Sequence, residues 1–416
     1  MSKVLLKDIA DIQSGPFGTQ LHKDEYVPNG VFMPNAKNIG NGNIITDSMD
    51  FVSEQVCKRL PRYILQSGDI LFGRAGSIER HAYVGNDYAG CFQGTNCIRI
   101  RCNNPEIARF ISYYLWLPEI KQSILNKTGG SVLPYITSDL LKEIEIDMPD
   151  EEIALKISNT VGVLDRKIEC NNHINDNLWQ AISTIYDYWF TQFDFPNAYG
   201  KPYRTSGGEL VWNDKIKRAI PSGWIVTSII SNPLTQVIKP GVDVFETKEY
   251  LATAEVTGTS IASGSIIDYE NREGRANMQP VVNSVWFAKM KNSIKHLFLN
   301  KEMAPIIDST ILSTGFCGLQ CSEKSFEYVA SFVSNPRFEI IKDILAHGAT
   351  QEAVNNDDME SIAFVIPSDE ILEQYHAATK GMFAQISKNI CENRELIKVR
   401  DWLLPMLMNG QATIAD

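Results

Sequence analysis

The sequence repeats itself, and this internal duplication limits the folds open to the chain more than any other feature. The stretch "LLKEIEIDMPDEEIALKI" aligns with "DMESIAFVIPSDEILEQY", so that Pro149 meets Pro367 at a shift of 218 residues. Upstream, "GDILFGRAGSIERH" aligns with "NSVWFAKMKNSIKH" at a shift of 215, which places Arg74 opposite Lys289. Since small changes of shift fall where loops are expected, the pattern predicts a globular unit and a helix, followed by a second copy of both.

A long amphipathic helix is expected after each of the two prolines. Apolar residues recur at alternating steps of three and four over residues 153–189, and the spacing returns over residues 371–407, where Thr379 and Arg400 interrupt it. The first segment would span about 55 Å as a helix. Because neither helix could bury such a stripe alone, we expect the two to pair as an antiparallel coiled coil.

Each apolar stripe carries two asparagines near its middle, Asn171 and Asn175 in the first copy and Asn389 and Asn393 in the second. An antiparallel pairing would bring all four to one level. A buried asparagine costs stability but fixes the register of a coiled coil, because a slip leaves its amide unpaired. We therefore predict that these residues set the register; the alternative is that they face water at a loose midpoint.

The two globular units are expected to be mixed α/β, which makes the predicted fold class α+β. Short strand-like runs lie between Gly, Asn and Asp turns, and each unit closes with a short helical segment. A segment rich in Pro and Gly separates the first helix from the second unit. The predicted divisions are a first globular domain at 1–149, a central helix at 150–195, a linker at 196–223, a second globular domain at 224–367 and a C-terminal helix at 368–416.

Composition narrows the class of protein. The net charge of -11 taken alone points away from nucleic acid, but the larger segments are near balance and leave room for a basic face on each unit. No apolar run is long enough for a secretory signal or a membrane span, so we expect a cytoplasmic protein. The eight cysteines are expected to be reduced, and Cys317 and Cys321 lack a second pair of ligands at zinc-site spacing, so we expect no metal.

The parts of an enzyme are missing from the sequence. It has no phosphate-binding loop, no dinucleotide fingerprint, no zinc-protease motif and no nucleophile elbow. The strings closest to the catalytic motif of a DNA amino-methyltransferase, "NNPEI" and "SNPRF", lack its second proline and its aromatic residue. His22 and His81 stand alone near glycine-rich turns and are expected to be ordinary surface or contact residues. We therefore expect no catalytic residue and no cofactor.

A globular unit and a long helix, repeated in tandem over the whole chain, resemble the specificity (S) subunit of type I restriction-modification systems. The segments that carry the resemblance are "IADIQSGPFGTQLHKDEYVPNGVFMPNAKNIGNG", "LQSGDILFGRAGSIERHAYV", "GGSVLPYITSDLLKEIEIDMP" and "ENRELIKVRDWLLPMLMNGQ". The chain departs from the family at the start of the first helix. Many relatives have Pro-Pro and Glu-Gln there, whereas this chain has "MPDEEIALKI" and keeps only Glu373 and Gln374 in the second copy.

The resemblance implies a non-catalytic subunit that recognises DNA. Each globular unit would be a target recognition domain for one half of a bipartite double-stranded site, and the coiled coil would separate the two. Such subunits hold two methyltransferase (M) subunits, and the complex recruits endonuclease (R) subunits. The rival hypotheses are a two-lobed scaffold that binds only proteins, which the acidic total charge favours, and an adenine methyltransferase, which the missing motifs disfavour.

Candidate DNA contacts follow from the chemistry of recognition. Arg, Lys, Asn and Gln recognise base edges, while Arg, Lys, Ser, Thr and backbone amides in glycine-rich turns contact phosphates. Of all candidates, the Arg74 and Lys289 pair is favoured most, because both copies keep a cation there. The candidates are Lys37, Asn38, Arg74, Ser77, Arg80, Lys127, Thr128 and Ser131 in the first domain, and Lys289, Lys291, Asn292, Thr350 and Gln351 in the second.

Overall fold

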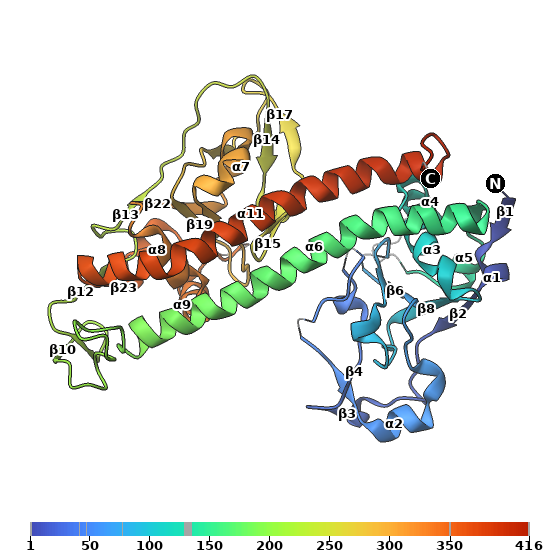
Figure 1. The fold of residues 1–416 in the computed structure, drawn as a ribbon, viewed down its shortest axis with the longest axis horizontal. Helices are drawn as coiled ribbons and strands as arrows, with labels where there is room; N and C mark the ends of the chain where they lie inside the picture. The colour runs from blue at the N-terminus through green and yellow to red at the C-terminus, as the bar shows by residue number, and fades with distance from the viewer. Residues whose placement is uncertain are drawn as a thin grey trace. The chain divides into compact units, whose positions relative to one another are not determined.

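The computed structural model describes residues 2–40, 42–46, 48–76, 78–128, 135–348 and 351–414, and Figure 1 shows its helices and strands. The chain divides into two compact units. The first unit comprises Met1–Asp165 and Val399–Asp416, and the second comprises Arg166–Lys398. Each of the two long helices therefore contributes to both units. The five divisions that the sequence predicts stay a prediction.

A four-stranded antiparallel sheet, in the order β2-β8-β6-β7, forms the centre of the first unit. Its strands are β2 (Ala10–Ser14), β6 (Ile70–Gly73), β7 (His81–Tyr83) and β8 (Cys97–Cys102). The apolar run of β6 is buried along its whole length, as expected for a central strand covered on both faces. Helix α3 (Ala108–Tyr114) contributes Phe110 and Ile111 to the same hydrophobic core as this sheet.

The other elements of the first unit complete this domain around the sheet. Strand β1 (Ser2–Leu5) pairs with β9 (Glu145–Met148), which leads directly into the first long helix. The remaining helices and strands are α1 (Leu6–Ile9), β3 (Tyr26–Val27), β4 (Val31–Phe32), β5 (Phe51–Val52), α2 (Glu54–Arg59), α4 (Pro118–Lys127) and α5 (Ser138–Lys142). Short 3-10 helices lie at Lys23–Glu25, Ala36–Asn38, Pro61–Tyr63, Asn86–Tyr88 and Pro105–Ile107.

The second unit repeats this architecture. Its central sheet has the order β13-β22-β19-β20, with the same antiparallel pairing as the first. A second ladder again closes the domain, formed here by β12 and β23. The repeated elements are β12 (Ile225–Ser228), β13 (Thr235–Val237), β19 (Ser284–Ala288), β20 (His296–Leu299), β22 (Phe316–Cys321), α8 (Phe326–Ser334), α9 (Pro336–Leu345), α10 (Asn356–Met359) and β23 (Ala363–Ile366).

The two sheets match in register as well as in strand order. Phe72 lies opposite His81 in the first sheet, and Phe287 lies opposite His296 in the second. The residues of each pair are separated by the 215-residue shift that the sequence alignment requires. The duplication predicted from the sequence is therefore confirmed at the level of individual strand partners.

One part of the second unit exceeds the repeat. A further four-stranded sheet, in the order β17-β14-β21-β18, lies where the first unit has only the small sheet β3-β5-β4. Strands β14 and β21 pair in parallel. The elements of this insertion are β14 (Lys248–Leu251), β15 (Val256–Thr257), β16 (Ser260–Ile261), β17 (Ser265–Ile267), β18 (Ala276–Met278), α7 (Ala304–Ser309) and β21 (Thr310–Ser313), with 3-10 helices at Thr253–Glu255 and Lys301–Met303.

Two long helices follow the two domains. Helix α6 (Glu151–Tyr186) ends in a π-helical turn at Asp187–Thr191, and helix α11 (Asp369–Met408) contains Pro405 near its end. The carbonyls of Asp150 and Ser368 accept the first intrahelical hydrogen bonds, as the N-cap position requires. Acidic residues in the first turn of each helix favour its positive end.

The long helices pair antiparallel within each unit. In the second unit, Lys167 pairs with Glu392 at 3.1 Å, while the rings of Trp179 and Phe383 lie 5.3 Å apart. In the first unit, Ala154, Ile157 and Val161 share a core with Leu404, Leu407 and Met408. The α+β class with tandem domains and an antiparallel helix pair is thus confirmed, although Ile153, the first residue of the predicted stripe, is exposed.

The linker between α6 and the second domain is ordered rather than loose. Strands β10 (Leu210–Asn213) and β11 (Arg218–Pro221) form a hairpin within it. The ring of Phe195 stacks on Tyr203 at 4.6 Å and on Trp224 at 5.1 Å. Aromatic stacking at these distances stabilises the folded segment beyond the area that it buries.

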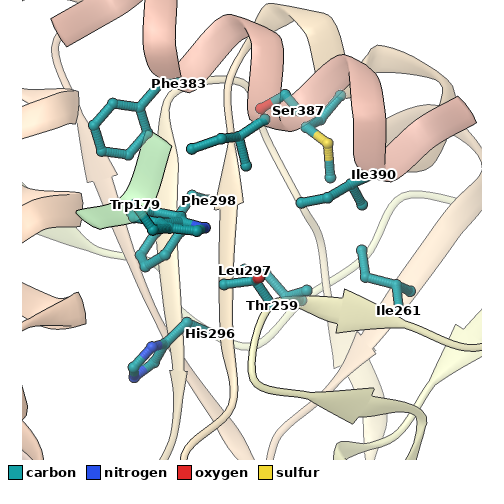
Figure 2. Close-up of a pocket in the computed structure, with 11 residues that line it drawn as sticks. Trp179, Thr259, Ile261, His296, Leu297, Phe298, Phe383, Ser387 and Ile390 are labelled. Atoms are coloured by element: carbon teal, nitrogen blue, oxygen red, sulfur yellow. The ribbon is translucent and has the colours of Figure 1, made fainter. Parts of the chain in front are cut away.

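Side chains of both long helices pack against the second domain. Figure 2 shows Trp179 of α6 beside Phe298 of β20 and Phe383 of α11, around a cavity of about 10 Å³. The ring of Phe383 is 1% exposed and meets Trp179 edge to face. The helices and the second domain therefore share one closely packed core.

Replacing Phe383 by alanine should lower the free energy of unfolding of the second unit by about 3–5 kcal/mol, because it removes buried contacts and leaves a cavity. Denaturant unfolding followed by tryptophan fluorescence measures the change. The exposed Lys388→Ala on the same helix is the control and should stay within about 0.5 kcal/mol of the parent. Equal effects of the two substitutions would contradict this packing.

Candidate nucleic-acid interface

Arg74 and Lys289 occupy the same backbone position in the two domains. Arg74 follows the last residue of β6, and Lys289 follows the last residue of β19. The carbonyl of Arg74 accepts a hydrogen bond from the amide of Ile136 at 2.9 Å, and the carbonyl of Lys289 accepts one from Val354 at 3.0 Å. These two amides are themselves 218 residues apart. The structure therefore places one cation at the end of the same central strand in each domain.

Arg74 lies at an open cavity of about 400 Å³ in the first domain. Its guanidinium carbon lies 4.7 Å from the ring centre of Phe17 and 4.9 Å from that of Tyr135. Only 8% of the residue is exposed, and its Nε is buried without a hydrogen-bond partner. The cavity is lined by Pro16, Phe17, Gly18, Leu21, Lys23, Tyr26, Arg74, Thr95, Asn96 and Tyr135.

The remaining candidates of the first domain differ in how available they are. Lys37 forms an ion pair with Asp50 at 3.0 Å, whereas Arg80 and Lys127 are exposed. Thr128 is half-buried, and its hydroxyl donates to the carbonyl of Leu125 at 2.7 Å. Ser77 and Ser131 lie outside the described residues.

Asn38 is a correction to the predicted contacts. Its side chain is 0% exposed. The amide nitrogen donates to the carbonyl of Ile45 at 2.9 Å, and the amide oxygen accepts from the backbone of Asn35 at 3.0 Å. Because the side chain serves the local fold, it has no surface with which to reach DNA.

The candidates of the second domain lie on and near the turn between β19 and β20. Lys289 is half-buried, and Lys291 forms an ion pair with Glu352 at 2.8 Å. Asn292 adopts a φ of 54°, and its backbone amide donates to Asp343 at 3.0 Å. Its left-handed conformation suits asparagine in a tight turn. Gln351 is exposed, and Thr350 lies outside the described residues.

A buried lysine that the sequence analysis did not identify supports this turn. Lys342 of α9 is 0% exposed, and its ammonium donates to the carbonyls of Ala288 at 3.2 Å and Ser293 at 3.1 Å. It also pairs with Glu339 at 2.6 Å. At a shift of 218 its counterpart is the buried Ile124. A lysine at a position that is apolar in the other copy was the signal available in the sequence.

Each sheet carries one buried histidine at the same position. Nε2 of His81 lies 2.9 Å from the carbonyl of Ser112, and burial lowers the pKa of His81 to about 3. His296 instead lies 2.8 Å from Glu339. Burial alone would raise the pKa of Glu339, but hydrogen bonds from His296 and Lys342 lower it. His81, expected at the surface or in a contact, is thus a neutral residue of the core.

The four asparagines of the helix pair meet in two layers within the second unit. The amide of Asn171 donates to Asn393 at 2.9 Å, and the amide of Asn389 donates to Asn175 at 2.8 Å. All four are at least nine-tenths buried. Asn393 also donates to the neighbouring Asn172 at 2.8 Å. The structure therefore brings these side chains together across the seam; their part in setting the register stays a prediction.

Charged groups flank the asparagine layers. The carboxylate of Glu392 accepts from Asn171 at 2.8 Å and pairs with Lys167 at 3.1 Å. The hydrogen bond from Asn171 and the contact with Lys167 lower the pKa of Glu392. This carboxylate therefore remains ionised near neutral pH and adds a charge-assisted hydrogen bond to the layer.

Two general properties bear on the class of protein. All eight cysteines are free, Cys317 and Cys321 among them. No helix in the described part of the chain combines the length and the apolar character that crossing a membrane requires.

Known proteins share this sequence and this fold. The Methylase_S family, the type I restriction modification DNA specificity domain, matches residues 1–180. The type I restriction enzyme HindI specificity subunit of Haemophilus influenzae is 23% identical over 441 residues, which cover 91% of this chain and 94% of that protein. The chain belongs to the family of type I restriction-modification specificity subunits.

Other specificity subunits agree with this assignment. The type I restriction enzyme MjaIX specificity subunit of Methanocaldococcus jannaschii is 24% identical over 331 residues, which cover 74% of this chain and 70% of that protein. The crystal structure of the S subunit of a type I restriction-modification system from M. genitalium matches with a TM-score of 0.52 at 14% identity, over 98% of this chain and 95% of that one. At this identity the likeness concerns the fold. As a specificity subunit, the chain serves the recognition of DNA sequence.

The buried His81 predicts how the stability of the first recognition domain depends on pH. Its pKa falls from about 6.5 in the unfolded chain to about 3 in the fold, so the unfolded chain binds the extra proton between these values. The stability contributed by neutral His81 is therefore complete above about pH 6.5, and it should fall by up to about 1.4 kcal/mol per pH unit on acidification below that pH.

The variant His81→Gln isolates this contribution, because glutamine does not titrate. We expect the free energy of unfolding of the variant to fall less steeply than that of the parent between about pH 6.5 and pH 4.5. Urea unfolding at a series of pH values measures both slopes. Parallel slopes would show that His81 is not neutral in the fold.

Proposed function

We propose that this specificity subunit recognises an asymmetric bipartite DNA site, with one half-site for each recognition domain, and has no catalytic role of its own. The observation that carries the proposal is the repetition of one domain with matching strand register and a cation after the same central strand, Arg74 in one copy and Lys289 in the other. Two copies of one DNA-binding unit that differ in side chains are suited to two different half-sites.

The antiparallel helices supply the spacer in this proposal. Two modules that bind one face of a duplex are best served by half-site centres about 34–36 Å apart, one helical turn. Helices of 36 and 40 residues are long enough to set such a distance. The hydrogen bonds among Asn171, Asn175, Asn389 and Asn393 would hold that distance constant, because they are satisfied in one register.

The partners in this proposal are two methyltransferase subunits, held by the chain, and endonuclease subunits that join the complex. The net charge of -11 favours a protein partner that supplies further positive charge for DNA binding. The same charge favours the second candidate, a two-lobed scaffold that binds proteins without DNA specificity. Co-purification with a methyltransferase, followed by DNA binding of the complex, separates the two candidates.

Mapping of methylated bases in cells with and without this chain tests the bipartite site directly. The expected result is a motif of two short, unlike half-sites around a spacer of unspecified bases, present only with the chain. A single continuous motif would contradict two-domain recognition, and an unchanged methylation pattern would favour the scaffold. Saturable binding of a methyl-donor cofactor by the chain alone would instead support an enzymatic role.

The asparagine layers yield a separate prediction. The double variant Asn171→Leu and Asn389→Leu removes one amide from each layer and makes slipped registers more favourable. A slip of one turn moves a helix by about 5.4 Å, more than the rise of about 3.4 Å per base pair. We therefore expect the complex to methylate sites with altered spacers.

Methylation of duplexes whose spacers differ by single base pairs measures this effect. The matched control is Asn177→Leu, which changes an exposed asparagine on the same helix and should leave the spacer preference unchanged. An unchanged preference in the double variant would mean that the asparagines do not set the register.

A further inference from the structure

We propose that Arg74 recognises a guanine in the half-site of the first domain, by donating hydrogen bonds from Nη1 and Nη2 to O6 and N7 of the base. The inference rests on the proposed function, since it names the base that one recognition domain selects. It concerns the first domain alone.

The first step is the absence of an internal counter-charge. Arg74 is 8% exposed, and among the described residues it has no ion pair and no side-chain hydrogen bond. Burying a cation without a partner is costly, so folds retain one mainly where another molecule supplies the acceptor. By contrast, the neighbouring Arg101 is fully engaged, with two bonds to Asp69 at 2.7 and 2.6 Å.

The second step is which atoms stay available. Nε of Arg74 is buried and has no partner, but Nη1 and Nη2 are not among the buried atoms that lack one. These terminal nitrogens therefore keep access to the open cavity of about 400 Å³ that Arg74 lines. A guanidinium held in this way offers two parallel N–H donors, the pattern that matches O6 and N7 of guanine.

The third step is the rigidity of the guanidinium. The rings of Phe17 and Tyr135 lie 4.7 and 4.9 Å from its central carbon, in cation–π contact. Such contacts fix the direction of the fork before DNA arrives, which lowers the entropy cost of a directional bond. A phosphate contact gains little from this, because phosphates accept from many directions and flexible exposed lysines suffice for it.

The second domain lacks this arrangement at the equivalent position. The isolated bridge between Ala75 and Tyr135 corresponds to the bridge between Met290 and Ala353, so that alanine stands where the first domain has Tyr135. The cation there is Lys289, whose ammonium is a point charge without a planar fork. The duplication therefore provides a built-in comparison between a clamped arginine and an unclamped lysine.

The test uses the complete complex of this chain with its methyltransferase subunits and a library of duplexes randomised in both half-sites. The parent complex should select a G·C pair at one position of one half-site. In the complex with Arg74→Lys, the preference for that pair should fall by roughly 5- to 100-fold, because lysine keeps the charge but loses the second donor. The preferences in the other half-site should be unchanged.

A change on the DNA provides a test that leaves the protein intact. Replacing the selected guanine by 7-deazaguanine removes N7 but keeps base pairing, and it should weaken binding of the parent complex by several-fold while affecting the Arg74→Lys complex much less. Phe17→Leu keeps the arginine and loosens its clamp, so it should lower the same preference and serves as a second variant if Arg74→Lys folds poorly. The matched control is Lys289→Arg, which should leave the first half-site unchanged.

The outcomes separate this inference from the proposed function. An Arg74→Lys complex that binds all sequences more weakly by one factor, with no effect of 7-deazaguanine, would identify a phosphate contact and overturn the inference. A bipartite motif without a fixed G·C pair that depends on Arg74 would also overturn it, while leaving two-domain recognition intact. A parent complex with no bipartite preference would refute the proposed function itself.

Discussion

The pairing of two long helices across a seam that contains asparagine is the constraint on which the rest of the structure depends. Most of the seam is apolar and would tolerate sliding, because apolar contacts have little directional preference. The amides are different, since Asn171 must meet Asn393 while Asn389 meets Asn175. Specificity in the helix pair therefore comes from a few directional bonds, and stability comes from the apolar layers around them.

Around this helix pair, one fold serves as two different surfaces. The strand order and the strand partners are the same in the two sheets, so the backbone after the central strand is presented alike in both copies. The side chains there have diverged, with a clamped arginine in one domain and a half-buried lysine in the other. The buried interior has diverged too, because Ile124 of one copy corresponds to the charged Lys342 of the other. A common scaffold thus permits independent change at the positions that face a ligand.

Features that depend on periodicity or on repetition could be predicted from the sequence, and features that depend on distant contacts could not. The helices and the duplication follow from residue spacing, and the Arg74 and Lys289 pair follows from the alignment. Asn38 was wrongly taken as a DNA contact, because its burial depends on a hydrogen bond to Ile45 that no local pattern reveals. Phe17 and Tyr135 flank Arg74 only after the strands have assembled, so the aromatic clamp could not be read from the sequence.

The buried contact between Arg394 of α11 and Glu249 of β14 limits how freely the two domains could be exchanged. Glu249 belongs to the inserted sheet, which the first domain lacks, and it also accepts from the amide of Gly264 at 2.6 Å. A chimera that placed a copy of the first domain in the second position would leave Arg394 buried without its carboxylate, at a cost of several kcal/mol. Despite their common ancestry of sequence, the two domains are therefore matched to their own places along the helices, and a designer of new specificities would have to transplant the helix residue together with the domain.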